Sequence, residues 1–116
     1  MYDITCVPKR YFPVKLTAED DEGKLHTTVV EVEPPRLRTL REMFDVVEQS
    51  QSMQDNGGIT ENIMTALRDS IKTMLSKNKA GYKVPDEYVE AMDIDQMEGL
   101  FTAYFSWIAE TKKEKN

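Results

Sequence analysis

The sequence predicts an α+β fold: an N-terminal antiparallel β-hairpin, then three main helices and one short helix. Two periods in the apolar residues indicate it. Before Pro34-Pro35 the apolar residues alternate with polar ones, as in a half-buried strand. After these prolines they recur every three or four residues, as on one face of a helix. The length of 116 residues suffices for one core but not for two.

We therefore expect a single domain spanning residues 1–116. Its hairpin region is predicted at 1–33 and its helical region at 34–110. Residues 111–116 have no apolar side chain to bury, so we expect them to form a frayed tail.

The hairpin is predicted from two segments, 11–18 and 25–33, separated by a polar turn that contains Gly23. In the first segment every second residue is apolar. The inward face of this segment comprises Phe12, Val14, Leu16 and Ala18. Pro13 favours a position at the edge of the sheet. A similar alternation in residues 2–6 allows a short third strand.

The first long helix is predicted to begin near Pro35, since proline suits a first helical position, and to run to about Gln51. Its inward face comprises Leu37, Leu40, Phe44 and Val47, with Met43 beside them. Val46 points elsewhere. From Ser50 to Gly58 the sequence is polar and ends in two glycines, so we expect a mobile loop there.

The second long helix is predicted to start at a Thr60 cap and to end before Gly81. Its apolar side comprises Ile63, Met64, Leu67, Ile71, Met74 and Leu75. Pro85 opens a short helical piece through Met92, with Tyr88 and Met92 as its inward contacts.

The last helix, 93–108, has the highest density of apolar and aromatic residues in the chain. At 100° per residue, these residues fall within an arc of roughly 160°. The arc comprises Ile94, Met97, Leu100, Phe101, Tyr104, Phe105, Trp107 and Ile108. Asp93 and Gln96 have the spacing of a capping box. We expect this helix to organise the core, and a stripe so wide also suits contact with a partner.

Charge and composition disfavour several classes of partner. The net charge of −6 opposes nucleic acid as the main ligand, because phosphate binding requires clustered lysine and arginine. Two small basic groups are expected to be solvated surface: Arg36, Arg38 and Arg41, and Lys77, Lys79 and Lys83. No apolar run approaches the roughly 20 residues of a membrane span. The N-terminus does not resemble a secretory signal, and the single cysteine suits a reducing compartment, so we expect a cytoplasmic protein without a membrane partner.

The residue pattern does not predict an enzyme. The sole cysteine, Cys6, and the sole histidine, His26, have no third group to orient them as a catalytic dyad. Zinc sites take three or four ligands at recognisable spacing, and calcium loops of the EF-hand type need a glycine and a glutamate at fixed positions. The adjacent glycines Gly57 and Gly58 are not followed by the Gly-Lys-Ser/Thr of a phosphate loop. We expect no catalysis, no metal and no cofactor.

The seven methionines are a further unusual feature. Methionine fills irregular gaps in cores, and it is also common on surfaces that accept varied partners. Met53 lies in the predicted polar loop without a role in the core. It is therefore the methionine that we most expect to contact another chain.

The C-terminal half of the chain resembles the tail assembly chaperones of long-tailed bacteriophages and prophages. The resemblance covers roughly residues 60–110. Its most specific part is the Ala-Tyr-Phe-x-Trp-Ile sequence at 103–108, preceded by an acidic capped turn at Asp93. The N-terminal hairpin matches only loosely.

This resemblance implies a small, largely helical, non-enzymatic protein in the cytoplasm of a bacterial host. Such chaperones coat the long tape-measure protein before the tail tube polymerises around it, and then leave. It implies the tape-measure protein as partner, with the major tail protein as a second candidate, and it leaves a homo-oligomer open. By position, a partner contact is transferred to the following residues, to which Met53 is added: Leu100, Phe101, Tyr104 and Trp107.

The competing hypothesis is a structural subunit that stays in the particle, such as a tail-completion or head–tail joining protein. There the hairpin would pair subunits by strand addition. Gene context separates the two hypotheses, because a gene between those of the major tail protein and the tape-measure protein favours the chaperone. The sequence does not identify the client, the oligomeric state, the host or any frameshifted longer form.

Overall fold

The computed structural model describes residues 1–55, 57–58 and 60–110. Within these residues a two-stranded antiparallel sheet precedes three long helices and one short one, so the predicted α+β fold is confirmed. In chain order the elements are η1 (Ile4–Cys6), β1 (Phe12–Glu19), β2 (Leu25–Val32), α1 (Leu37–Asp55), α2 (Glu61–Ser76), α3 (Asp86–Glu90) and α4 (Ile94–Ala109). The predicted frayed tail, 111–116, lies outside the described residues.

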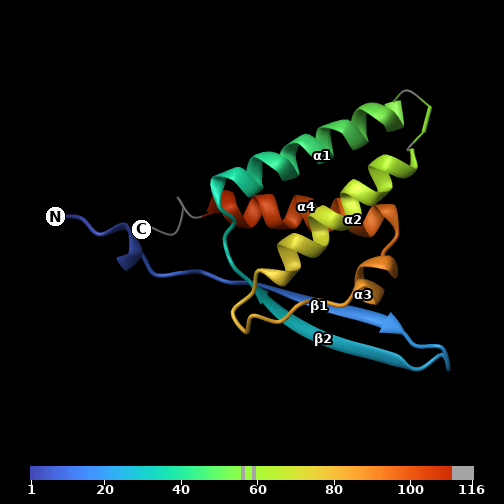
Figure 1. The fold of residues 1–116 in the computed structure, drawn as a ribbon, viewed down its shortest axis with the longest axis horizontal. Coiled ribbons are helices and arrows are strands. Elements are labelled where there is room, and N and C mark those ends of the chain that lie inside the picture. Colours follow the sequence, from blue (N-terminus) through green and yellow to red (C-terminus); the bar gives the residue numbers. More distant parts are fainter. Residues whose placement is uncertain (56, 59, 111–116) are drawn as a thin grey trace.

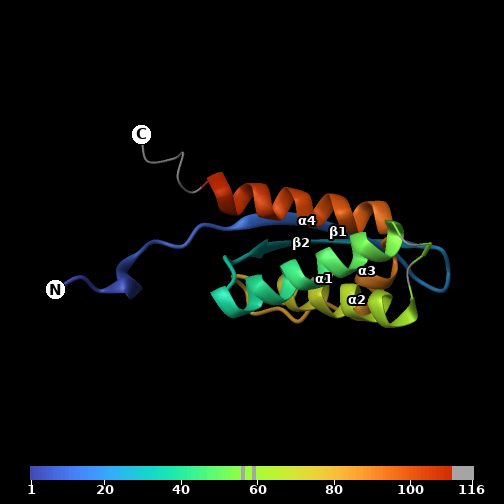
Figure 2. The ribbon, with the colours of Figure 1, turned by 90° about the horizontal axis from the view of Figure 1, so that it is seen from above.

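The helices and the hairpin lie around α2 (Figure 1). Helices α1 and α2 run antiparallel, and the hairpin lies on the other side of α2 from α1. Seen from above, α4 and α2 lie on opposite sides of the molecule (Figure 2). The first ten residues extend away from this body as an arm, and residues 1–9 of the arm are exposed.

The hairpin forms in the predicted register of alternating faces. Its strands pair from Phe12 opposite Val32 to Glu19 opposite Leu25. The buried residues on its inner face are Leu16, Ala18, Val30 and Val32. In the turn, the carboxylate of Asp20 accepts hydrogen bonds from the backbone N–H groups of Glu22 and Lys24, both at 2.9 Å.

The third strand allowed by residues 2–6 is wrong. These residues include the short 3-10 helix η1, whose start is capped by the Asp3 carboxylate, which accepts from the backbone N–H of Thr5 at 3.0 Å. All three residues of η1 are exposed. A local side-chain hydrogen bond therefore determines this conformation, because no strand among the described residues pairs with the arm.

The predicted starts of α2 and α4 are confirmed. The hydroxyl oxygen of Thr60 accepts from the backbone N–H of Ile63 at 3.4 Å. At α4 the Asp93 carboxylate accepts from the backbone N–H of Gln96 at 2.7 Å, and the Gln96 side chain accepts from the backbone N–H of Asp93 at 2.9 Å. Both caps satisfy N–H groups that a helix leaves without internal partners.

The prediction for α1 is wrong in its length and in part of its buried face. The helix starts at Leu37 and continues past Gln51 to Asp55. Met43 is buried and Val47 packs against the core, as predicted. However, Ser50 is buried and Val46 also packs against the core, whereas Leu37 is 62% exposed and Phe44 47% exposed. The helix is therefore rotated about its axis relative to the predicted apolar face, and Ser50, two turns after Met43, lies on its buried side.

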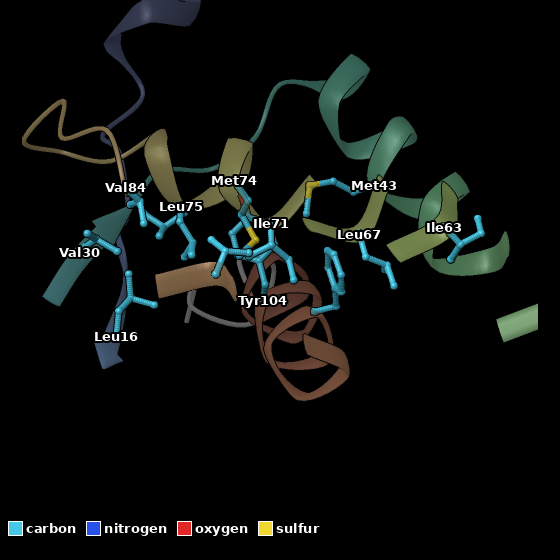
Figure 3. Packing of buried hydrophobic residues seen from close by; sticks show 13 residues of the cluster. Leu16, Val30, Met43, Ile63, Leu67, Ile71, Met74, Leu75, Val84 and Tyr104 are labelled. Carbon is cyan, nitrogen blue, oxygen red and sulfur yellow. The ribbon is translucent and has the colours of Figure 1, made fainter. Parts of the chain in front are cut away.

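The core is built along α2 (Figure 3). Leu16 and Val30 of the hairpin lie at one end of the cluster and Ile63 at the other, with Ile71 and Tyr104 between them. Five of the six predicted inward residues of α2 are buried: Ile63, Leu67, Ile71, Met74 and Leu75. Met64, the sixth, is 51% exposed.

The contacts predicted for the short helix need one correction. Tyr88 and Met92 are only partly buried, whereas Val89 is completely buried. Helix α3 spans five residues, of which Val89 is buried, and the predicted Tyr88 and Met92 pack against the core beside it.

Candidate functional site

The C-terminal half of α4 is fixed against the hairpin by aromatic rings. Tyr104 is 1% exposed, and its hydroxyl donates to the backbone carbonyl of Glu33 at 3.1 Å. The ring of Phe12 lies 5.6 Å from that of Tyr104 and 5.4 Å from that of Trp107, measured between centroids. Burial raises the pKa of the Tyr104 hydroxyl above its ordinary value.

Arg10, at the base of the arm, holds the end of the same helix. Its guanidinium lies 4.4 Å from the centroid of the Trp107 ring and donates to the backbone carbonyl of Trp107 at 3.1 Å. Trp107 is partly buried between Arg10 and Phe12. A cation near helix carbonyls at a C-terminus is favourable, so this contact secures the last turn of α4.

Glu33 connects the hairpin to the segment after α2. Its carboxylate accepts from the ammonium groups of Lys77 at 3.1 Å and of Lys9 at 3.2 Å. The hydrogen bond from Lys77, together with that from Lys9, holds the pKa of Glu33 below its ordinary value despite partial burial. The C-terminal half of α4 is therefore held by both polar contacts and aromatic rings.

The N-terminal half of α4 borders open space instead. One hollow of about 390 Å³ lies between the starts of α2 and α4 and the end of α3. A second, of about 220 Å³, lies between α1 and α4. The two adjoin, because Leu67, Ile94 and Met97 line both. We call them together the methionine groove, whose apolar lining comprises Val47, Met64, Leu67, Val89, Met92, Ile94, Met97, Phe101 and Phe105.

Three methionines give this groove a deformable lining. Met64 is half exposed, and Met92 and Met97 are partly buried. Their unbranched side chains can adopt many rotamers, so the groove can adjust to apolar side chains of different shapes. Leu67, at 3% exposure, supplies a fixed floor. The arrangement suits reversible binding of apolar side chains.

The structure distributes the predicted partner residues over both halves of α4. Tyr104 is buried, at 1% exposure, and contacts a partner only if α4 moves, whereas Phe101, at 3% exposure, forms part of the floor of the hollow between α1 and α4. Leu100 is partly buried, and it lines a separate hollow against β1 and α3. The ring of Trp107 packs against the guanidinium of Arg10. Of these four residues, Phe101 alone lines the methionine groove.

Met53 does not lie in a polar loop as predicted. It belongs to α1, packs against the core, and its sulfur accepts a hydrogen bond from the Thr60 hydroxyl at 3.7 Å. It contributes to the connection between α1 and α2. It is not among the residues that line the methionine groove.

The sequence interpretation missed the groove residues Met64, Met92, Ile94 and Met97 as a group. The sequence pattern places all four on the inward faces of their predicted helices, and three of them are methionines. The excess of methionine was the available signal. The location of the groove was not predictable, because a hollow between three helices depends on the distances between them and not on the apolar period of any one helix.

The two residues considered for a catalytic dyad lie apart. Cys6 is exposed in η1, on the arm, and His26 is at the turn end of the hairpin, where its ring hydrogen-bonds Asp20 at 2.8 Å. The eight residues of β1, about 25 Å of strand, separate these positions. Within residues 1–55, 57–58 and 60–110, no three His, Cys, Asp or Glu side chains gather as they would around a metal ion.

Two further findings concern the chain as a whole. Among the described helices, none combines the length and the apolar character needed to cross a bilayer. Comparison of the chain with models of protein families, with curated proteins and with solved structures finds no match. A function for the chain is therefore inferred from its residues and their geometry.

Proposed function

We propose that this chain is a tail assembly chaperone of a long-tailed bacteriophage or prophage. It binds an apolar helical segment of the tape-measure protein in the methionine groove, in the host cytoplasm, and performs no chemistry. The observation that carries the proposal is an open, methionine-lined groove on the same helix, α4, that bears the resemblance at residues 103–108.

A groove bounded by helices suits a helical client. An amphipathic helix presents apolar side chains at every third or fourth position, and these can enter successive hollows along a groove. A tape-measure protein offers many segments of differing sequence. The flexible side chains of Met64, Met92 and Met97 suit such variety better than aromatic rings would.

The hypothesis of a structural subunit has one observation in its favour. Leu25 and Val29 on the outer face of the hairpin are 63% and 61% exposed. Strand addition, however, requires a free sheet edge. At β2 the carbonyl of Glu31 already accepts from the backbone N–H of Lys79 at 2.9 Å, and in β1 Pro13 has no N–H to donate. We therefore prefer the chaperone hypothesis, in which the client binds in the methionine groove.

Co-expression with the tape-measure protein of the same genome tests the proposal. We expect the chain to keep that protein soluble, to be recovered with it, and to be absent from purified tails, because the client must be released as the tube forms. Stoichiometric presence in purified tails would favour the structural subunit. If the chain neither binds the client nor enters the particle, both hypotheses fail.

A matched pair of substitutions locates the binding surface. Met64 and Leu37 are similarly exposed, at 51% and 62%, but only Met64 lines the groove. Met64→Ser should weaken client retention by about tenfold, roughly the value of one apolar anchor, while Leu37→Ser should leave it unchanged. Equal losses in both variants would place the contact elsewhere.

A further inference from the structure

The rim of the methionine groove carries an excess of negative charge. Its lining includes three glutamates, Glu61, Glu90 and Glu98, and one basic residue, Arg68. Arg68 already donates to the carboxylates of Glu90 at 3.0 Å and of Asp69 at 3.2 Å. Three carboxylates against one guanidinium give the lining residues a formal charge of −2.

Two further carboxylates lie close to the rim. The groove opens near the start of α4, where Asp93 caps the helix and Asp95 lies in the first turn. The exposed arginines Arg36, Arg38 and Arg41 lie at and just before the start of α1, which is at the opposite end of the molecule (Figure 1). These three arginines therefore do not offset the charge of the rim, since exposed charges farther apart than about 10 Å are largely screened in salt.

We propose that the groove selects an amphipathic helix whose apolar stripe is flanked by lysine or arginine. This inference rests on the proposed function and specifies the client segment. The apolar stripe enters the hollows lined by Leu67 and Met97, and the flanking cations face Glu61 and Glu98. Exposed ion pairs contribute little affinity each, so the rim acts mainly on selectivity and on the association rate.

The charge and shape of the groove also disfavour two other occupants. An apolar helix flanked by glutamate would place like charges against Glu61 and Glu98, which is unfavourable. A second copy of the chain is the other candidate, since its arm carries exposed Met1, Tyr2 and Ile4. The helical part of that arm is the three-residue 3-10 helix η1, so the arm does not present the helical apolar stripe that the hollows would take.

Three synthetic helical peptides of about 18 residues test the selectivity directly. They share one leucine stripe, and their flanking positions carry lysine, serine or glutamate. We expect the lysine peptide to bind the full chain most tightly and the glutamate peptide most weakly. The advantage of the lysine peptide over the serine peptide should fall as salt rises from about 50 to about 500 mM, because rim charges become screened.

Two double variants separate the rim from the overall charge of the chain. Glu61→Gln with Glu98→Gln should reduce binding of the lysine peptide by about three- to tenfold and leave the serine peptide unaffected. Glu31→Gln with Glu42→Gln removes the same charge from exposed positions outside the groove and should change neither. Equal losses in the two double variants would overturn the inference, because net charge alone would explain the preference.

The remaining outcomes distinguish the two proposals. Equal binding of the lysine and serine peptides would overturn selection by the rim and leave the groove as a client site. Failure of every peptide to bind would remove the groove itself. Self-association of the chain that Met64→Ser abolishes would also overturn the inference, because a second copy would then be the occupant.

Discussion

The two halves of α4 carry the same apolar stripe but meet different surroundings. In the C-terminal half, Tyr104 and Trp107 are enclosed by Phe12, Arg10 and a hydrogen bond to the Glu33 carbonyl. In the N-terminal half, Ile94, Met97 and Phe101 border two adjoining hollows, one of which extends to Phe105. One stripe can therefore serve as core at one end and as binding surface at the other.

The difference follows from side-chain chemistry. Aromatic rings are rigid and large, and a tyrosine hydroxyl adds a directional hydrogen bond, so they determine where a helix lies. Methionine is flexible and has no strong polar partner to satisfy. Substitutions should therefore affect stability mainly at the C-terminal end of α4 and client binding mainly at the N-terminal end.

The largest expected effect is at Tyr104. Tyr104→Ala should lower the free energy of unfolding by about 3–5 kcal/mol, because it empties a fully buried ring site and removes a hydrogen bond. Met97→Ala, at a partly buried site beside a hollow, should cost about 1 kcal/mol. Urea unfolding of both variants measures the difference. Similar losses at the two sites would contradict the division of α4 into two halves.

An intermediate effect is expected at Arg10. Arg10→Ala removes a cation–π contact with Trp107 and a hydrogen bond to its carbonyl, and should cost about 1–2 kcal/mol. Lys9→Ala is the control, since the Lys9 side chain is 58% exposed and its ion pair with Glu33 contributes about 0.5 kcal/mol. If both variants unfold at the same urea concentration, the arm does not secure α4.

The smallest effect, about 0.5–1 kcal/mol at pH 7, is expected for Glu33→Gln. The hydrogen bond from Lys77 lowers the pKa of Glu33 in the folded state, so the stabilisation is complete above the unfolded-state pKa of about 4.3. It is lost as the pH falls through the lower folded-state pKa. Thermal melts between about pH 7 and pH 3 should therefore show a shallower acid loss in the variant than in the parent chain. Parallel curves would show that Glu33 does not contribute.

Features determined by neighbouring residues were predictable from the sequence. The capping box of Asp93 and Gln96 involves residues three apart, and the alternation of the hairpin is a local period. The rotation of α1 was not predictable, because a periodic stripe does not say which of its edges faces α2. Buried Ser50 and exposed Phe44 show the consequence.

The candidate site was predicted less completely than the fold. The last helix was identified as a binding element, but Tyr104 and Trp107 belong to the enclosed half. Aromatic residues suit interfaces and cores equally, so their type does not separate the two roles. The groove depends on the distances between α1, α2 and α4, and these are set by contacts far apart in the sequence, such as that between the rings of Phe44 and Phe105, whose centroids lie 4.6 Å apart.

The groove is tested most directly by NMR of the chain with carbon-13 in its methionine methyl groups, titrated with the lysine- and serine-flanked peptides. Met64 and Met97 line the groove, whereas Met43 and Met74 are core residues at 1% and 3% exposure and provide internal controls. We expect the signals of Met64 and Met97 to shift with each peptide and those of Met43 and Met74 to stay in place. Shifts confined to Met1 on the arm, or no shift at Met64 and Met97 with bound peptide, would contradict the groove as the binding site.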